Sequence, residues 1–84
     1  MPYIQGANRR YELRTGALPE TVGELDYVLT IHVLRYLSHQ MISFTTLNGI
    51  VGTLDNVKDE FRRRILHPYE DLKRAENGDV YPDS

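Results

Sequence analysis

Apolar residues recur every three or four positions in two long runs of the chain. The first run, between residues 20 and 39, carries two apolar stripes: Leu25, Val28, Leu29, Val33, Tyr36 and Leu37 in one, and Tyr27, Ile31 and Leu34 in the other. This spacing is typical of an α-helix. A helix that is apolar around so much of its circumference must be buried on more than one side. We therefore predict a helix over residues 20–39 with more than one packing partner.

The second run forms one regular stripe and predicts a helix over residues 44–66, with Leu47, Ile50, Val51, Leu54, Val57, Phe61 and Ile65 on it. Only a short connection separates the two helices, which favours a hairpin. Gly49 and Gly52 each cost about 1 kcal/mol relative to Ala inside a helix. Either another backbone approaches them closely, or the regular helix begins only near Thr53.

Capping and breaking residues mark the predicted helix ends. Thr21 and Glu24 have the spacing of a capping box at the start of the first helix. Pro68 lacks a backbone N–H, so it is expected to end or kink the second helix and to open a short third helix over residues 68–77. Asn77-Gly78 then forms a strong helix stop.

The two ends of the chain are less periodic. Residues 1–19 are interrupted by Pro2, Gly6, Gly16 and Pro19, and they predict an extended arm with at most a short helical turn at residues 8–13. The tail, residues 78–84, is expected to fold back and pack through Val80 and Tyr81. The predicted fold is thus all-α and a single domain over residues 1–84: a helical hairpin, a short third helix and an N-terminal arm.

Chain length adds an argument for self-association. A chain of 84 residues has a small core, and the absence of cysteine excludes stabilisation by disulfides. We therefore expect a symmetric homo-oligomer. The sequence shows no signal peptide and no long apolar segment. We therefore expect a cytoplasmic location and no association with a membrane. The formal net charge of −2 argues against a binder of duplex nucleic acid.

Three blocks of sequence resemble a family of small uncharacterised proteins of bacteriophages and bacteria, a domain-of-unknown-function family. The blocks are the Met1-Pro2-Tyr3-Ile4 start with Arg9, the Gly23-Glu24-Leu25 segment with Tyr27, and the Val57-Lys58, Arg62-Arg63, Pro68-Tyr69-Glu70-Asp71 and Glu76-Asn77-Gly78-Asp79-Val80-Tyr81 segments. Asp26 stands where Asn is usual, and residues 38–50 lie outside the resemblance. The resemblance implies a small phage or prophage accessory protein in the cytoplasm of an infected host, without a known activity.

Signatures of catalysis and metal binding are weak. His32 and His39 lie about 10 Å apart along one helix face, too far to share an ion without further ligands. The serines lack the Gly-x-Ser-x-Gly elbow of a hydrolase. We therefore expect no enzyme, no catalytic residue, no metal and no cofactor.

Tyrosines and basic side chains alternate near both ends of the chain. Rings can stack on bases while guanidinium groups hold phosphates. The candidate ligand-binding residues are Tyr3, Arg9, Arg10, Tyr11, Arg63, Tyr69, Lys73, Asn77 and Tyr81. The competing interpretation is that these tyrosines only pack the arm and tail onto the hairpin, and that the arginines form a solvated basic surface.

Two functions from different classes follow. The first is a non-enzymatic phage protein that sequesters a small anionic nucleotide, such as a cyclic-nucleotide signal of host antiviral immunity. The comparison with such nucleotide-sequestering proteins is architectural only. The alternative is a protein–protein inhibitor or adaptor that binds a host or phage protein through a helical face.

Overall fold

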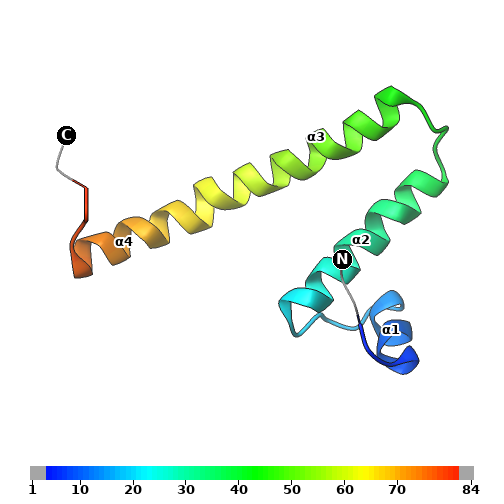
Figure 1. Cartoon of the computed structure of the whole chain (residues 1–84), viewed down its shortest axis with the longest axis horizontal. Coiled ribbons are helices and arrows are strands. Elements are labelled where there is room, and N and C mark those ends of the chain that lie inside the picture. Colours follow the sequence, from blue (N-terminus) through cyan, green and yellow to red (C-terminus); the bar gives the residue numbers. More distant parts are fainter. Residues whose placement is uncertain (1–3, 82–84) are drawn as a thin grey trace. The chain divides into compact units, whose positions relative to one another are not determined.

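The computed structural model describes residues 4–81, and these residues form helices and no strand (Figure 1). The α-helices are Ala7–Arg14 (α1), Val22–Ser38 (α2), Phe44–Phe61 (α3) and His67–Asn77 (α4), with a π-helical segment η1 at Arg62–Leu66. The all-α class predicted from the sequence is confirmed. By their contacts the residues fall into two compact units, 1–46 and 47–84. The hairpin and the symmetric oligomer stay predictions.

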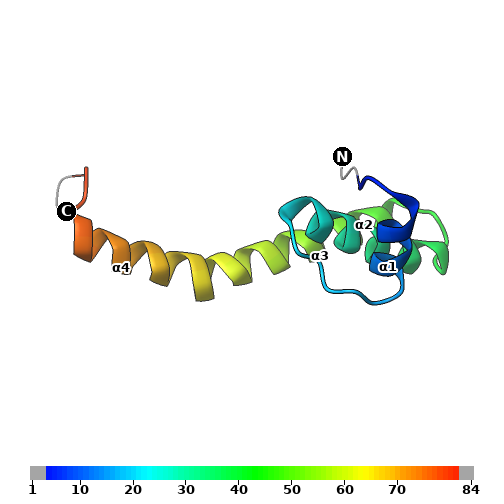
Figure 2. The same cartoon turned by 90° about the horizontal axis from the view of Figure 1, so that it is seen from below.

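In the first unit, α1 lies beside α2, as both views show (Figures 1 and 2). The arm was predicted to be extended, but residues 7–14 form two turns of helix. Gly6, at a φ of +89°, bends the chain into α1, and the Thr15 hydroxyl donates to the Tyr11 carbonyl at 2.8 Å where the helix ends. Leu13 is 4% exposed and is the one buried side chain among the described residues.

One of the two hydrogen bonds of the capping box predicted for α2 is formed. The Thr21 hydroxyl accepts a hydrogen bond from the Glu24 backbone N–H at 3.1 Å, which satisfies a donor that the helix itself leaves open. The reciprocal half of a capping box would bring the Glu24 carboxylate back to the Thr21 N–H. Instead, that carboxylate accepts from the Glu20 N–H at 2.9 Å and from Arg9.

In the second unit, the helix does not break at Pro68. The end of α3, η1 and α4 follow one another without a loop (Figure 1). The His67 N–H donates to the Arg62 carbonyl five residues back, the wider turn of a π-helix. Pro68 then stands in the first turn of α4, directly after the π-helical segment, and donates no backbone hydrogen bond there because it has no N–H. The wider turn replaces the expected break.

The helix ends and glycines settle two further expectations. α3 begins at Phe44, so the alternative of a late start near Thr53 is wrong. Among residues 4–81, a Cβ added at Gly49 or Gly52 would meet nothing within 4 Å. α4 ends at Asn77, and Gly78 follows at a φ of +86° with its N–H on the Arg74 carbonyl at 2.8 Å, as the stop signal predicted.

The described part of the tail does not pack as predicted. Val80 and Tyr81 are 93% and 76% exposed. The chain turns back after Gly78 only far enough for Asp79 to pair with Arg74 at 3.7 Å. The physical reason is that α4 presents charged side chains here, so an ion pair forms where apolar packing was expected.

Candidate functional site

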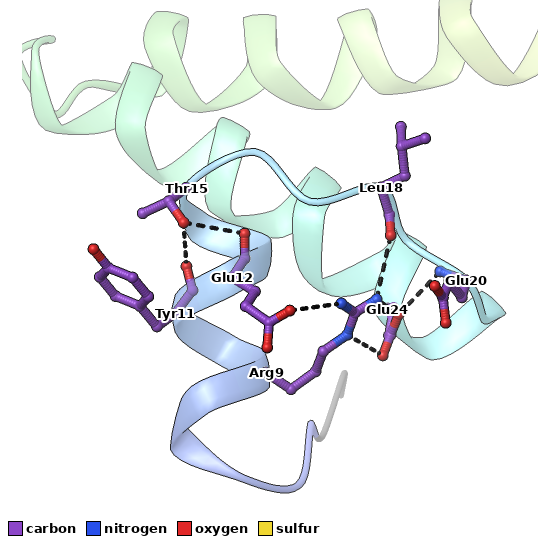
Figure 3. Close-up of polar contacts among 7 residues, drawn as sticks. All are labelled: Arg9, Tyr11, Glu12, Thr15, Leu18, Glu20 and Glu24. Carbon is purple, nitrogen blue, oxygen red and sulfur yellow. Dashed lines mark hydrogen bonds and ion pairs between the residues drawn. The ribbon is translucent and has the colours of Figure 1, made fainter.

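Arg9 joins α1 to α2 through a forked ion pair (Figure 3). Its Nε and Nη2 donate to the two carboxylate oxygens of Glu24 at 2.8 and 2.6 Å. Nη2 also donates to the Leu18 carbonyl at 3.2 Å, and Nη1 reaches Glu12 at 3.5 Å. The two side chains are 25% and 15% exposed, so the pair is partly shielded from water. One guanidinium therefore ties together α1, the loop that follows it and the first turn of α2.

The same contacts shift the titration of Glu24. The hydrogen bonds from Arg9, and then the one from the Glu20 N–H, lower the pKa of the Glu24 carboxyl to about 2. The hydrogen bond to Glu24 raises the pKa of the Arg9 guanidinium above its ordinary value. Both groups stay charged over the whole neutral range. Arg9 was predicted to hold a ligand, and in the structure its donors bond to Glu24, Leu18 and Glu12, so its ligand role stays a prediction.

The other residues predicted from the sequence divide between the two units. In the first unit, Arg10 donates to the Ile4 carbonyl at 2.8 Å, and the Tyr11 side chain is 63% exposed. Tyr3 lies outside the described residues. In the second unit, Arg63 pairs with Glu60.

The helix α4 brings two of the predicted residues together. The Lys73 ammonium lies 5.6 Å from the centre of the Tyr69 ring, within cation–π range, and it also lies 3.3 Å from Glu76. Tyr69 stays 56% exposed. Asn77 is the last residue of α4, one helical turn further on. These residues form an open surface rather than an enclosed site.

A more enclosed hollow lies in the first unit, between the loop after α1 and one face of α2. Residues 14–19, the end of α1 and the loop after it, form one wall, and the apolar side chains Leu13, Val28 and Ile31 line it further. Its lining includes Arg14, Arg35 and His32 and no acidic residue. Arg35 donates to the Arg14 carbonyl at 2.8 Å, which fixes the loop against α2. Sequence reasoning missed this site, because Arg14, His32 and Arg35 form no recognisable spacing.

Residues 4–81 hold no cluster of three or more His, Asp or Glu side chains placed to bind a metal ion. No helix in this part of the chain combines the length and the apolar character needed to cross a membrane.

A family model matches residues 1–80 of the chain. The chain belongs to DUF6899, a family described as a domain of unknown function. The uncharacterised family inferred from the sequence blocks is thereby confirmed at this coarser level. Neither the curated proteins nor the solved structures include a match to this DUF6899 member.

Proposed function

We propose that the protein binds a small phosphate-bearing anion in the hollow between residues 14–19 and α2, and that it sequesters this ligand without converting it. The supporting observation is the lining: three basic side chains, Arg14, His32 and Arg35, and no acidic one. Arginine binds phosphate oxygens through strong, charge-assisted hydrogen bonds. The apolar lining from Leu13, Val28 and Ile31 suits the non-phosphate part of such a ligand.

The ligand class first expected from the sequence stays within this proposal. A cyclic nucleotide of host antiviral immunity carries phosphates and a base with an apolar face, and a phage protein that holds it needs no catalytic group. The site, however, is moved from the Tyr and Arg residues near the chain ends to the hollow of the first unit. Arg9 takes a structural role, because Glu24, Leu18 and Glu12 accept its hydrogen bonds.

The test is a thermal-shift screen of the full chain against cyclic di- and trinucleotides, ADP-ribose and inorganic pyrophosphate, followed by calorimetric titration. A ligand that binds the folded state raises the melting temperature by mass action. Arg14→Ala and Arg35→Ala are expected to weaken binding by about ten-fold or more each, because each removes a charge-assisted hydrogen bond. Arg63→Ala is the matched control and should leave the affinity unchanged.

The variants also decide between the two candidate surfaces. Loss of binding in Arg63→Ala or Lys73→Ala, with Arg35→Ala unaffected, would place the ligand on the surface predicted from the sequence and contradict the hollow. No ligand-dependent shift with any compound would contradict sequestration of these anions. The protein–protein adaptor then becomes the leading candidate, and the exposed apolar stripe of the second unit supports it.

A further inference from the structure

The wall of the hollow is held differently at its two ends. The near end is folded onto α1, where the Ala17 N–H donates to the Glu12 carbonyl at 2.9 Å. The far end contains Pro19, which lines the hollow. Proline has no backbone N–H, so this end of the wall depends on the neighbouring residues Leu18 and Glu20 for hydrogen bonds.

The fork between Arg9 and Glu24 supplies both of these hydrogen bonds (Figure 3). Arg9 Nη2 donates to the Leu18 carbonyl at 3.2 Å, on one side of Pro19. Glu24 Oε1 accepts from the Glu20 N–H at 2.9 Å, on the other side. The same Nη2 and the same Oε1 lie 2.6 Å apart in the ion pair. A single ion pair therefore holds the backbone on both sides of Pro19.

Arg9 and Glu24 act on the hollow from outside it. The residues that line the hollow from the two helices are Leu13 and Arg14 of α1, and Val28, Ile31, His32 and Arg35 of α2. The fork lies on the first turn of each helix, so within residues 4–81 it contacts the wall without lining the hollow. Because α1 carries Arg9 and also supplies part of the lining, the shape of the hollow depends on the docking of α1.

Apolar packing contributes little to the position of the far end of the wall. The Leu18 side chain is 82% exposed. An exposed loop without hydrogen bonds samples many conformations, and fixing one of them costs backbone entropy. Hydrogen bonds that involve a charged group are stronger than those between neutral groups. The charged groups of the fork are therefore what holds this part of the wall in place.

We propose that Arg9 and Glu24 are positioning residues for the hollow: their ion pair holds residues 18–20 at its far end and couples anion binding to the docking of α1 on α2. The inference rests on the proposed function for its ligand, but not for the position of the wall. A ligand that needs the formed hollow binds more weakly when fewer molecules have it formed. By the same linkage, a bound ligand favours the docked form of α1.

Arg9→Ala tests the coupling in the full chain. It should weaken the binding of inorganic pyrophosphate by about ten-fold, because a smaller fraction of the molecules has the hollow formed. Arg9→Lys should recover part of the affinity, since an ammonium can donate to one partner but cannot form the fork. Arg62→Ala removes an equal charge from an exposed side chain of the second unit, and as the matched control it should leave the affinity unchanged. Equal affinity of Arg9→Ala and the wild type overturns the proposal.

Exchanging the two residues separates positioning of the wall from attachment of α1. Arg9→Glu/Glu24→Arg keeps an ion pair between α1 and α2. A carboxylate at position 9 has no donor for the Leu18 carbonyl, and a guanidinium at position 24 has no acceptor for the Glu20 N–H. Hydrogen exchange in α1 should therefore stay slow, while the Glu20 amide exchanges fast and pyrophosphate binds as weakly as in Arg9→Ala. Wild-type affinity in this double variant would show that the fork only attaches α1.

The wild-type chain gives a test that needs no variant. Saturating pyrophosphate should slow amide exchange at residues 10–12 of α1, which do not line the hollow, while exchange over α4 stays unchanged. Bound pyrophosphate without slower exchange at residues 10–12 would overturn the coupling.

Failure of the proposed function is distinguished by the ligand-free chain. A wild type that does not bind pyrophosphate contradicts binding of this anion in the hollow, whereas the Glu20 amide still reports on the wall. Fast exchange of this amide in Arg9→Ala, with slow exchange in Arg62→Ala, supports the positioning role. Exchange that is equally slow in both variants overturns it.

Discussion

The two units of the chain are stabilised by different kinds of contact. In the first, residues far apart in sequence meet: Arg9 grips Glu24, and Leu13 is buried where α1 packs on α2. In the second, every ion pair described joins residues within five positions of one another. The first unit thus has a small core of its own, whereas the described helix of the second unit leaves its apolar stripe exposed. The two parts of this short chain therefore differ in how far their own contacts can stabilise them.

The largest effect is expected from removing the core of the first unit. Leu13→Ala should lower the free energy of unfolding by about 2–5 kcal/mol, because a buried leucine is replaced by a cavity. Urea unfolding followed by circular dichroism measures this loss. Leu18→Ala, at a side chain that is 82% exposed, is the matched control and should change stability very little. Equal effects of the two changes would show that Leu13 is not the core.

The next effect concerns the ion pair that holds α1. Arg9→Ala should detach α1 from α2 and leave the Glu24 carboxylate without its forked partner. Amide hydrogen exchange in Ala7–Arg14 should become fast, while exchange in α4 stays as it is. Arg9→Lys should restore the protection only in part, because an ammonium cannot form the fork. Slow exchange in α1 of Arg9→Ala would contradict the structural role of this arginine and reopen its role as a ligand contact.

The same pair predicts a dependence on pH that is confined to the first unit. The pKa of Glu24 is lowered from about 4.5 to about 2, so its ionised form stabilises the fold at pH values above about 4.5. This stabilisation should be lost as the pH falls from about 4.5 towards about 2. Melting temperatures across this range measure it, and Glu24→Gln should remove this part of the acid dependence. An unchanged acid transition in Glu24→Gln would contradict the assignment.

The smallest effect is expected in α3. Gly49→Ala and Gly52→Ala should each stabilise the helix by about 1 kcal/mol, since a Cβ meets no neighbour there. Thermal unfolding measures the gain. A loss of stability that depends on protein concentration would instead show that another helix approaches these glycines in the assembly.

Capping and stop residues in the sequence predicted where the helices begin and end, whereas contacts between residues far apart in the sequence were not predicted. Thr21 and Asn77-Gly78 act within one helical turn, so α2 and α4 begin and end close to where the sequence indicated. The fork between Arg9 and Glu24 joins residues 15 positions apart, and no local pattern announces it. Pro68 carried a local signal for a break, but the helix continues through it after the π-helical segment Arg62–Leu66, which no local signal predicted.

The hollow of the first unit was not predicted from the sequence, for the same reason. Arg14 is the last residue of α1, whereas His32 and Arg35 lie on α2, so only the docking of α1 brings the three together. The tyrosines and basic residues named from the sequence fall into two groups, one in each unit, and their role in binding stays a prediction.

The most direct test of the two kinds of stabilisation is amide hydrogen exchange of the wild-type chain at low and high protein concentration. The account predicts that exchange over residues 61–77 slows as the concentration rises and the predicted homo-oligomer assembles, while exchange over α1 and α2 does not change. Protection over residues 61–77 that is strong and independent of concentration would show that this helix is covered within its own chain, and would contradict the account.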